Sequence, residues 1–312
     1  MGFDFDAGRV DTVAINAVTY PLGAGDCRLG MSYDETDFST SFLFTVHEVG
    51  HGLHEQGMDP GTRYLPNEGY VPFGILESQS RIWENQVARQ KAFWEKWLPI
   101  AEEYFPDLKK KNLTPEQVYN LKNRVEPTHT RVGADPICYL GQIVIRAKLE
   151  MAMMKGELKP KDLPEAWKAA YEKIGATVPD DLKGGCLQDP HWSGGAIGYF
   201  PAYALGDLRA AQLITAAHRQ DPQLQHQINN GNYAPLATWL RENVHTVGAT
   251  CEAEKLMTRI TGCPTDPRDY LSFLRQTFCG ETPSPDSGRG RSRISLPVVG
   301  GATPGNGGGF SL

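Results

Sequence analysis

The chain has 312 residues, 40% of them hydrophobic, which is enough for one large or two small domains with a buried core. Its net charge of −6 argues against a nucleic-acid binder and against binding to an anionic membrane surface, and no apolar run is long enough to span a bilayer. Six scattered cysteines do not make a disulfide scaffold, so free thiols in a reducing compartment are expected, although Cys251, Cys263 and Cys279 could pair in an exported protein.

The first elements in chain order are short strands and one polar helix. β-branched residues in "VDTVAINAVTY" and the segment "CRLGMSY" predict two strands within residues 9–34, with a turn at "PLGAGD". Residues 37–58 predict a helix that Asp37 or Ser39 caps and Gly57 ends. A proline-rich loop over 59–73 leads to a second helix over 74–98.

Helical patterns continue along most of the remaining chain. Thr114 and Pro115 predict the start of a helix over 114–124, and further helices are expected at 136–156, 163–175 and 197–219, then in shorter pieces to about 278. A glycine-rich loop covers 182–195. The sequence therefore predicts a mainly α domain over 1–279 with a small β element near the N-terminus. The glycine- and proline-rich residues 280–312 are expected to be a disordered tail.

One short motif contains residues suited to bind a metal ion and to activate water. In "FLFTVHEVGHGLHEQG", His47 and His51 lie four residues apart, so a helix projects both from one face and lets them bind one metal ion. Glu48 lies beside them, where a general base for water belongs. His54 lies about 10 Å further along the helix axis and cannot share that ion. The alternative is that the two histidines are ordinary core residues.

A third ligand has to come from another element, and the following helix offers Glu77 and Glu84. Glu77 is favoured because it lies near the start of that helix and faces back across the proline-rich loop. Glu84 is then expected to orient a ligand histidine, or else to form an ordinary ion pair.

Four motifs in order resemble the carboxypeptidase Taq family of metallocarboxypeptidases. They are "VHEVGHGLHEQG", "ESQSRIWEN", "RVGAD" and "GCLQDPHWSGGAIGYFPAYALGDLRAAQ", and the resemblance covers about residues 3 to 278. It implies a helical, zincin-like peptidase with a small sheet that removes single residues from peptide C-termini with broad specificity, usually sparing proline. It also implies zinc or cobalt as the metal, peptides as partners, a cytoplasmic location and a homodimer.

The resemblance also implies roles for individual residues. His47, His51 and Glu77 become metal ligands and Glu48 the base. Arg131 becomes the partner of the substrate's terminal carboxylate, which a guanidinium binds through two hydrogen bonds, unless it forms a structural ion pair with Asp135. Donors to the oxyanion or to the leaving amine are expected from the polar residues that follow the glycine-rich loop: His191, Tyr199 and Tyr203. Gln188 and Asp189 are expected to shape that loop, and Trp192 to pack.

Several positions depart from the family pattern. Leu76 stands where the family has histidine, Ile15-Asn16-Ala17 replaces HPF, Gly30 replaces the threonine of DxRxT, and Thr130 replaces the isoleucine of IRxxAD. The family's N-terminal helical segment has no counterpart here, so a fragment or a shortened homologue that needs a partner is expected. The alternatives are therefore a catalytically impaired homologue or fragment that binds peptides, and an endopeptidase or aminopeptidase built on the same ligands. An aminopeptidase needs an acidic cluster to bind the free amine of its substrate. The sequence shows no such motif beside the HExxH helix, which argues against this alternative.

Overall fold

Three short strands form a sheet near the N-terminus. The structure is a computed structural model that describes residues 1–281, apart from 14–16, 24, 35–36, 63–64 and 66–70. Strand β3 (Asp26–Met31) lies between β1 (Gly8–Thr12), to which it is parallel, and β2 (Val18–Gly23), to which it is antiparallel. Part of the predicted turn is wrong, because residues 21–23 continue β2.

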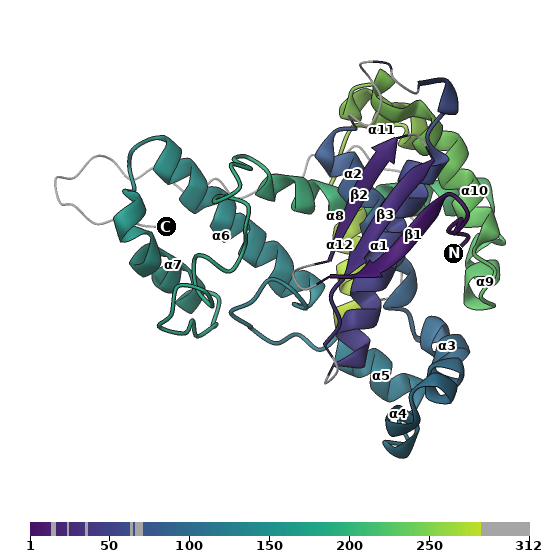
Figure 1. Ribbon diagram of the computed structural model, residues 1–312, viewed down its shortest axis with the longest axis horizontal. Coiled ribbons are helices and arrows are strands. Elements are labelled where there is room, and N and C mark those ends of the chain that lie inside the picture. Colours follow the sequence, from purple (N-terminus) through teal and green to yellow (C-terminus); the bar gives the residue numbers. More distant parts are fainter. Residues whose placement is uncertain (14–16, 24, 35–36, 63–64, 66–70, 282–312) are drawn as a thin grey trace.

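Helices make up most of the described chain, as predicted (Figure 1). The α-helices are α1 (Phe38–Gly57), α2 (Phe73–Arg81), α3 (Lys91–Tyr104), α4 (Pro106–Lys110), α5 (Pro115–Lys122), α6 (Pro136–Met154), α7 (Leu163–Glu172), α8 (Phe200–Gln220), α9 (Leu224–Asn229), α10 (Ala234–Asn243), α11 (Ala253–Thr261) and α12 (Arg268–Cys279). Shorter or wider helical turns are η1 (Pro60–Thr62), η2 (Ile82–Ala88), η3 (Pro160–Asp162) and η4 (His245–Thr250).

Local signals fix the start of α1. The side chain of Asp37 accepts a hydrogen bond from the backbone N–H of Thr40 at 3.0 Å, which satisfies one of the free donors of the first turn. The helix ends at Gly57, and Met58 follows in an extended conformation. Both boundaries agree with the prediction.

The predicted helix over 74–98 is wrong as a single element. α2 passes into the π-helix η2, and α3 begins only after Gln90, whose ψ of 149° breaks the helical path. Wider π turns often mark functional sites. Here every residue of η2 is buried, and the turn carries Glu84.

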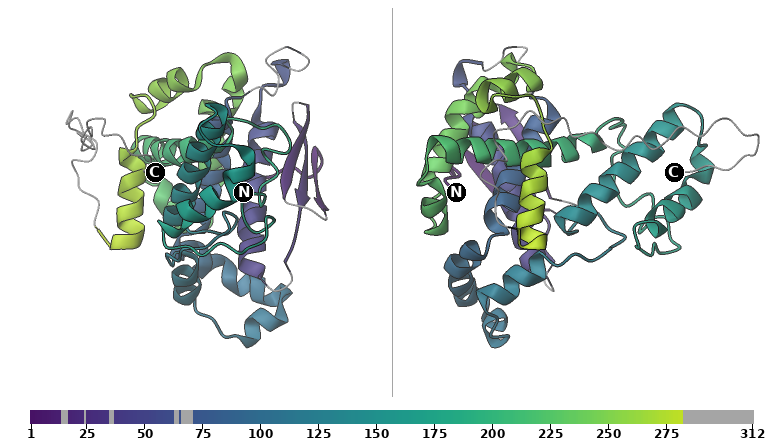
Figure 2. Two further views of the ribbon diagram at one scale, coloured as in Figure 1. Left: turned by 90° about the vertical axis from the view of Figure 1, so that its left-hand side faces the viewer. Right: turned by 180° about the vertical axis from the view of Figure 1, so that it is seen from behind.

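The sheet lies on one outer side of the molecule, with α1 against its inner face (Figure 2). Alternate residues of β3, Cys27, Leu29 and Met31, are fully buried there. α2 and α8 pack against each other behind α1, and the largest core cluster lies among these helices, α3 and α10. α6 and α7 project away from the sheet around a core of their own, which includes Trp167 and Tyr171 (Figure 1).

Two further expectations concern the thiols and the tail. Within the described part of the chain, all six cysteines are free, and none of the helices is long and apolar enough to cross a membrane. The tail predicted to be disordered lies outside the described residues from 282 onward.

Candidate metal centre

Two histidines of α1 and one glutamate of α2 converge on a common point. Nε2 of His51 lies 3.6 Å from Oε2 of Glu77, and Nε2 of His47 lies 3.7 Å from the same oxygen. The ligand atoms of the three residues all lie within 4.8 Å of one another. The structure thus brings together the three residues that the sequence suggested as ligands.

The spacing of these atoms fits a metal ion. Ligand atoms held at 2.0–2.1 Å from a tetrahedral ion are about 3.4 Å apart. The separations of 3.6 and 3.7 Å are close to that value, and they are long for direct hydrogen bonds. Two imidazoles and one carboxylate are also ligands that a divalent transition metal accepts. His47, His51 and Glu77 can therefore hold a divalent metal.

Charge in the centre is arranged to keep Glu77 ionised. Its burial would raise the pKa, but contact with His51 and the charges of His47 and Arg81 lower the pKa of Glu77 to about 2. Burial lowers the pKa of His51, and the neighbouring Glu77 more than reverses this, so the net shift is upward. The centre thus contains an anionic oxygen between two imidazoles.

Glu84, on η2, holds His47 from its other ring nitrogen. Oε2 of Glu84 lies 2.8 Å from Nδ1 of His47 and also accepts a hydrogen bond of 2.9 Å from Arg81. Burial raises the pKa of Glu84, but the cations Arg81 and Arg89 and the contact with His47 bring it far below its usual range. A carboxylate that accepts the Nδ1 proton leaves the Nε2 lone pair free for a metal.

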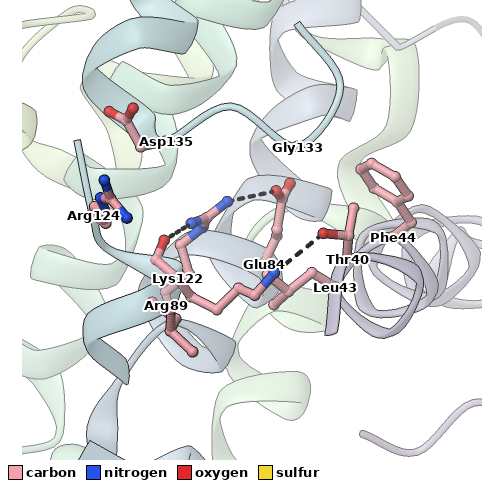
Figure 3. A pocket seen from close by; sticks show the side chains of 10 residues that line it. Thr40, Leu43, Phe44, Glu84, Arg89, Lys122, Arg124, Gly133 and Asp135 are labelled. Carbon is pink, nitrogen blue, oxygen red and sulfur yellow. Dashed lines mark hydrogen bonds and ion pairs between the residues drawn. The ribbon is translucent and has the colours of Figure 1, made fainter. Parts of the chain in front are cut away.

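A small cavity of about 60 Å³ adjoins Glu84 (Figure 3). Arg89 extends across it toward Glu84 and donates to the backbone oxygen of Lys122, while Nζ of Lys122 donates to Thr40 at 3.1 Å (Figure 3). Of these two cations, the buried Arg89 contributes to keeping Glu84 charged.

α8 approaches the centre through a glycine. A Cβ atom on Gly206 would lie 2.6 Å from Cβ and 3.0 Å from the carbonyl carbon of Glu77, so only glycine allows this contact. Just before α8, the hydroxyl of Tyr199 donates to Oε1 of Glu77 at 2.9 Å. Glu77 is therefore fixed from α8 as well as from its own helix.

The side chain of Glu48 is buried between α1 and the sheet. Its Oε2 accepts a hydrogen bond of 2.6 Å from the hydroxyl of Thr19 on β2. The sequence predicts Glu48 as the base but does not identify Thr19.

Arg131 is held in a network with Asp189, not with Asp135. Its Nε and Nη2 donate to Oδ1 of Asp189 at 3.0 and 2.9 Å, its Nη1 donates to the hydroxyl of Tyr139, and its guanidinium lies 4.7 Å from the ring centre of Tyr203. Asp135 instead caps α6 by accepting from the N–H groups of the first turn. Arg131, the residue predicted to bind the substrate's carboxylate, is thus a largely buried cation held by Asp189 and Tyr139.

His191 and the two tyrosines lie beside Glu77 and Arg131. Nε2 of His191 and the hydroxyl of Tyr203 are 2.9 Å apart, and the rings of Tyr199 and Tyr203 meet edge to face. Burial, followed by the charge of Arg131, lowers the pKa of His191. A neutral imidazole in contact with a phenol can donate hydrogen bonds without adding charge to the centre.

Gln188, Asp189 and Trp192, which lie close to His191 in the sequence, make structural contacts. Gln188 accepts from Arg131 and Arg146, and Asp189 also accepts from Arg146, so both residues hold the glycine-rich loop in place as expected. Trp192 packs against two core clusters and donates to Glu150.

His54 lies outside the metal centre. It is fully buried, its ring lies 5.2 Å from that of His245, and Nε2 of His245 contacts Oε1 of Gln79 at 3.0 Å. The two histidines form part of the polar packing between α1, α2 and η4.

The sequence did not reveal three residues that shape the centre. Thr19 contacts Glu48, Asp207 accepts from Asn85 in the buried network around Arg81, and the ring of Tyr139 lies 4.0 Å beneath the guanidinium of Arg81. All three act across long sequence separations, and no local pattern marks them.

The helical fold and the HExxH helix facing a glutamate of the next helix are the arrangement typical of one class of metallopeptidases. The chain belongs to the carboxypeptidase Taq (M32) metallopeptidase family, which it matches over residues 1–278.

Named relatives agree with this assignment. The chain is 39% identical over 277 residues to "Thermostable carboxypeptidase 1" of Thermus thermophilus, covering 89% of this chain and 54% of that protein. It is 34% identical to "Carboxypeptidase 1" of Bacillus subtilis, covering 89% and 55%. The crystal structure of an M32 carboxypeptidase from Deinococcus radiodurans superposes with a TM-score of 0.83 at 36% identity, covering 89% and 56%.

The chain spans about half the length of these relatives. Of the departures from the family pattern, Leu76 is partly buried on α2 directly before Glu77. Asn16 lies outside the described residues.

Proposed function

We propose that the chain is a zinc-dependent metallocarboxypeptidase that hydrolyses the C-terminal bond of peptides with broad specificity. The observation that supports it best is the convergence of Nε2 of His47, Nε2 of His51 and Oε2 of Glu77, with Glu48 on the same helix as the two histidines. Zinc is favoured by two imidazoles and one carboxylate, and cobalt accepts the same set.

Glu48 is the base in this proposal. A divalent metal bound at this position supplies Lewis acidity toward a peptide carbonyl and toward water. The carboxylate of Glu48 accepts a proton from the attacking water and then donates it to the leaving amine. In this proposal His191, Tyr199 and Tyr203 donate hydrogen bonds to the oxyanion or to the amine, with Tyr199 leaving Glu77 to do so; the contacts of Tyr199 with Glu77 and of Tyr203 with His191 support this role.

Arg131 restricts cleavage to the last bond. Its guanidinium binds the terminal carboxylate of a peptide, while Asp189 and Tyr139 hold it in a fixed orientation. A fixed cation that binds the terminal carboxylate favours an exopeptidase over an endopeptidase, because an endopeptidase has no terminal carboxylate to bind near the bond that it cleaves.

Peptides are the partners of this activity, and a homodimer in the cytoplasm is the setting we propose. Six free cysteines in the described part of the chain are compatible with a reducing compartment.

Peptide mass spectrometry tests the proposal. We expect the chain to remove residues one at a time from the C-terminus, a chelator to stop the loss, and zinc to restore it. Cleavage at internal bonds or from the N-terminus would contradict it. A chain that binds zinc and peptide without releasing any residue would instead be a catalytically impaired homologue.

A further inference from the structure

The two carboxylate oxygens of Glu48 have different surroundings. The hydroxyl of Thr19 lies 2.6 Å from Oε2 of Glu48 and 3.4 Å from the backbone oxygen of Glu48. Among the described residues, no other group donates a hydrogen bond to this carboxylate. Oε2 is thus bound from the sheet, and no residue in the described part of the chain donates to Oε1.

The strand register explains how Thr19 reaches Glu48. Thr19 on β2 is paired with Leu29 on β3, and directly paired residues project their side chains from the same face of a sheet. Leu29 is fully buried and lies over Gly52, where a Cβ atom would meet its Cδ2 at 3.2 Å. Gly52 lies one helical turn after Glu48, so the pair Thr19 and Leu29 covers two successive turns of α1.

We propose that Thr19 is a positioning residue for the catalytic base. Its hydroxyl holds Oε2 so that Oε1 alone faces the reacting water and the leaving amine. A hydrogen bond to a carboxylate is stronger than one between neutral groups, and a β-branched threonine has few rotamers, so this contact restricts rotation of the carboxylate. The inference rests on the proposed function, because it assigns a supporting role to the residue we propose as base.

Two substitutions at Thr19 distinguish the contribution of its hydroxyl group from that of its methyl group. Thr19→Val keeps the shape and removes the donor, and we expect kcat to fall about 10–100-fold while KM and the zinc content stay at parent values. Thr19→Ser restores the donor, and we expect kcat within about threefold of the parent. Thr12→Val, an exposed threonine-to-valine change on β1, is the matched control and should leave kcat unchanged.

A second measurement uses the metal-free protein and needs no activity. We expect Thr19→Val to lower Tm by about 2–4 °C, because a buried carboxylate loses its donor. In a Glu48→Ala background the same change should cause no fall in Tm, since no carboxylate remains to be held.

Three results would overturn the role of Thr19. These are parent kcat in Thr19→Val, equal losses of kcat in Thr19→Val and Thr19→Ser, or an equal fall in Tm with and without Glu48. If the unsubstituted chain releases no C-terminal residue, the proposed function itself fails, and the role of Thr19 fails with it.

Discussion

At the scale of residues, the candidate metal centre includes the groups that hold its proposed ligands in place. Glu84 contacts Nδ1 of His47 at 2.8 Å and is itself held by Arg81 and Arg89. Such partners orient a ligand ring and fix which nitrogen carries the proton.

Glu84→Gln should therefore weaken zinc binding by about 10–100-fold, because the amide is a poorer acceptor for the Nδ1 proton than the carboxylate. Competition with a chromogenic chelator measures this affinity. Glu95→Gln, a change on the exposed side of α3, is the control. Parent affinity in Glu84→Gln would show that His47 does not need this contact.

His245 makes stability depend on pH. Burial, then the charges of His54 and Arg241, hold the pKa of His245 well below 6.5. The folded state thus favours the neutral ring, so this group's contribution to stability is complete above pH 6.5 and is lost as the pH falls below it. The loss is at most about 1.4 kcal/mol per pH unit.

His245→Gln should accordingly flatten the dependence of the unfolding free energy on pH between about 6.5 and 5. Urea denaturation at several pH values gives that dependence. His226→Gln, on the exposed side of α9, should leave the parent slope unchanged. A slope in His245→Gln equal to that of the parent would mean that the acid sensitivity arises elsewhere.

At the scale of elements, the centre forms where α1, α2 and α8 pack closely. Gly50 of α1 lies against the backbone of α2, where a Cβ atom would come within 2.7 Å of Cα of Ser80. Gly206 of α8 lies equally close to Glu77. These two glycines set the distances between the helices that carry the ligands.

Gly206→Ala should lower the free energy of unfolding by about 1–3 kcal/mol and weaken zinc binding, because the new methyl group displaces Glu77. Urea denaturation and chelator competition measure the two effects. Gly141→Ala is the matched control in α6, where a Cβ atom meets nothing within 4 Å, and it should stabilise by up to about 1 kcal/mol. Unchanged zinc affinity in Gly206→Ala would show that Glu77 tolerates the shift.

The sequence predicts those elements whose signals are local. The Asp37 cap, the four-residue spacing of His47 and His51, and the Thr114 cap all lie within a few residues, and the structure contains each of them. The break between α2 and α3 and the π turn of η2 have no such signal. They place Glu84 beside His47 of α1, a contact across 37 positions that no spacing in the sequence marks.

The residues that support the site could not be predicted from the sequence for the same reason. Thr19 meets Glu48 across 29 positions, and Asn85 meets Asp207 across 122. A hydrogen bond between such distant residues depends on strand register and helix packing, which no spacing in the sequence reveals.

At the scale of the whole molecule, the centre joins the layers of the fold. α1 supplies two of the candidate ligands and Glu48, α2 supplies the third candidate ligand, Glu77, the sheet supplies Thr19, and the segment before α8 supplies Tyr199. The same layers occur in the relatives, of which this chain spans about half the length. We propose that this arrangement is a metal-dependent carboxypeptidase centre.

Glu48→Gln tests that claim most directly. Zinc content by mass spectrometry and release of C-terminal residues from a peptide are measured on the same preparations of parent and variant. We predict about one zinc per chain in both proteins, with release by the parent and a loss of at least about 100-fold in the variant, because an amide cannot take the proton. Release by Glu48→Gln at the parent rate would contradict the account.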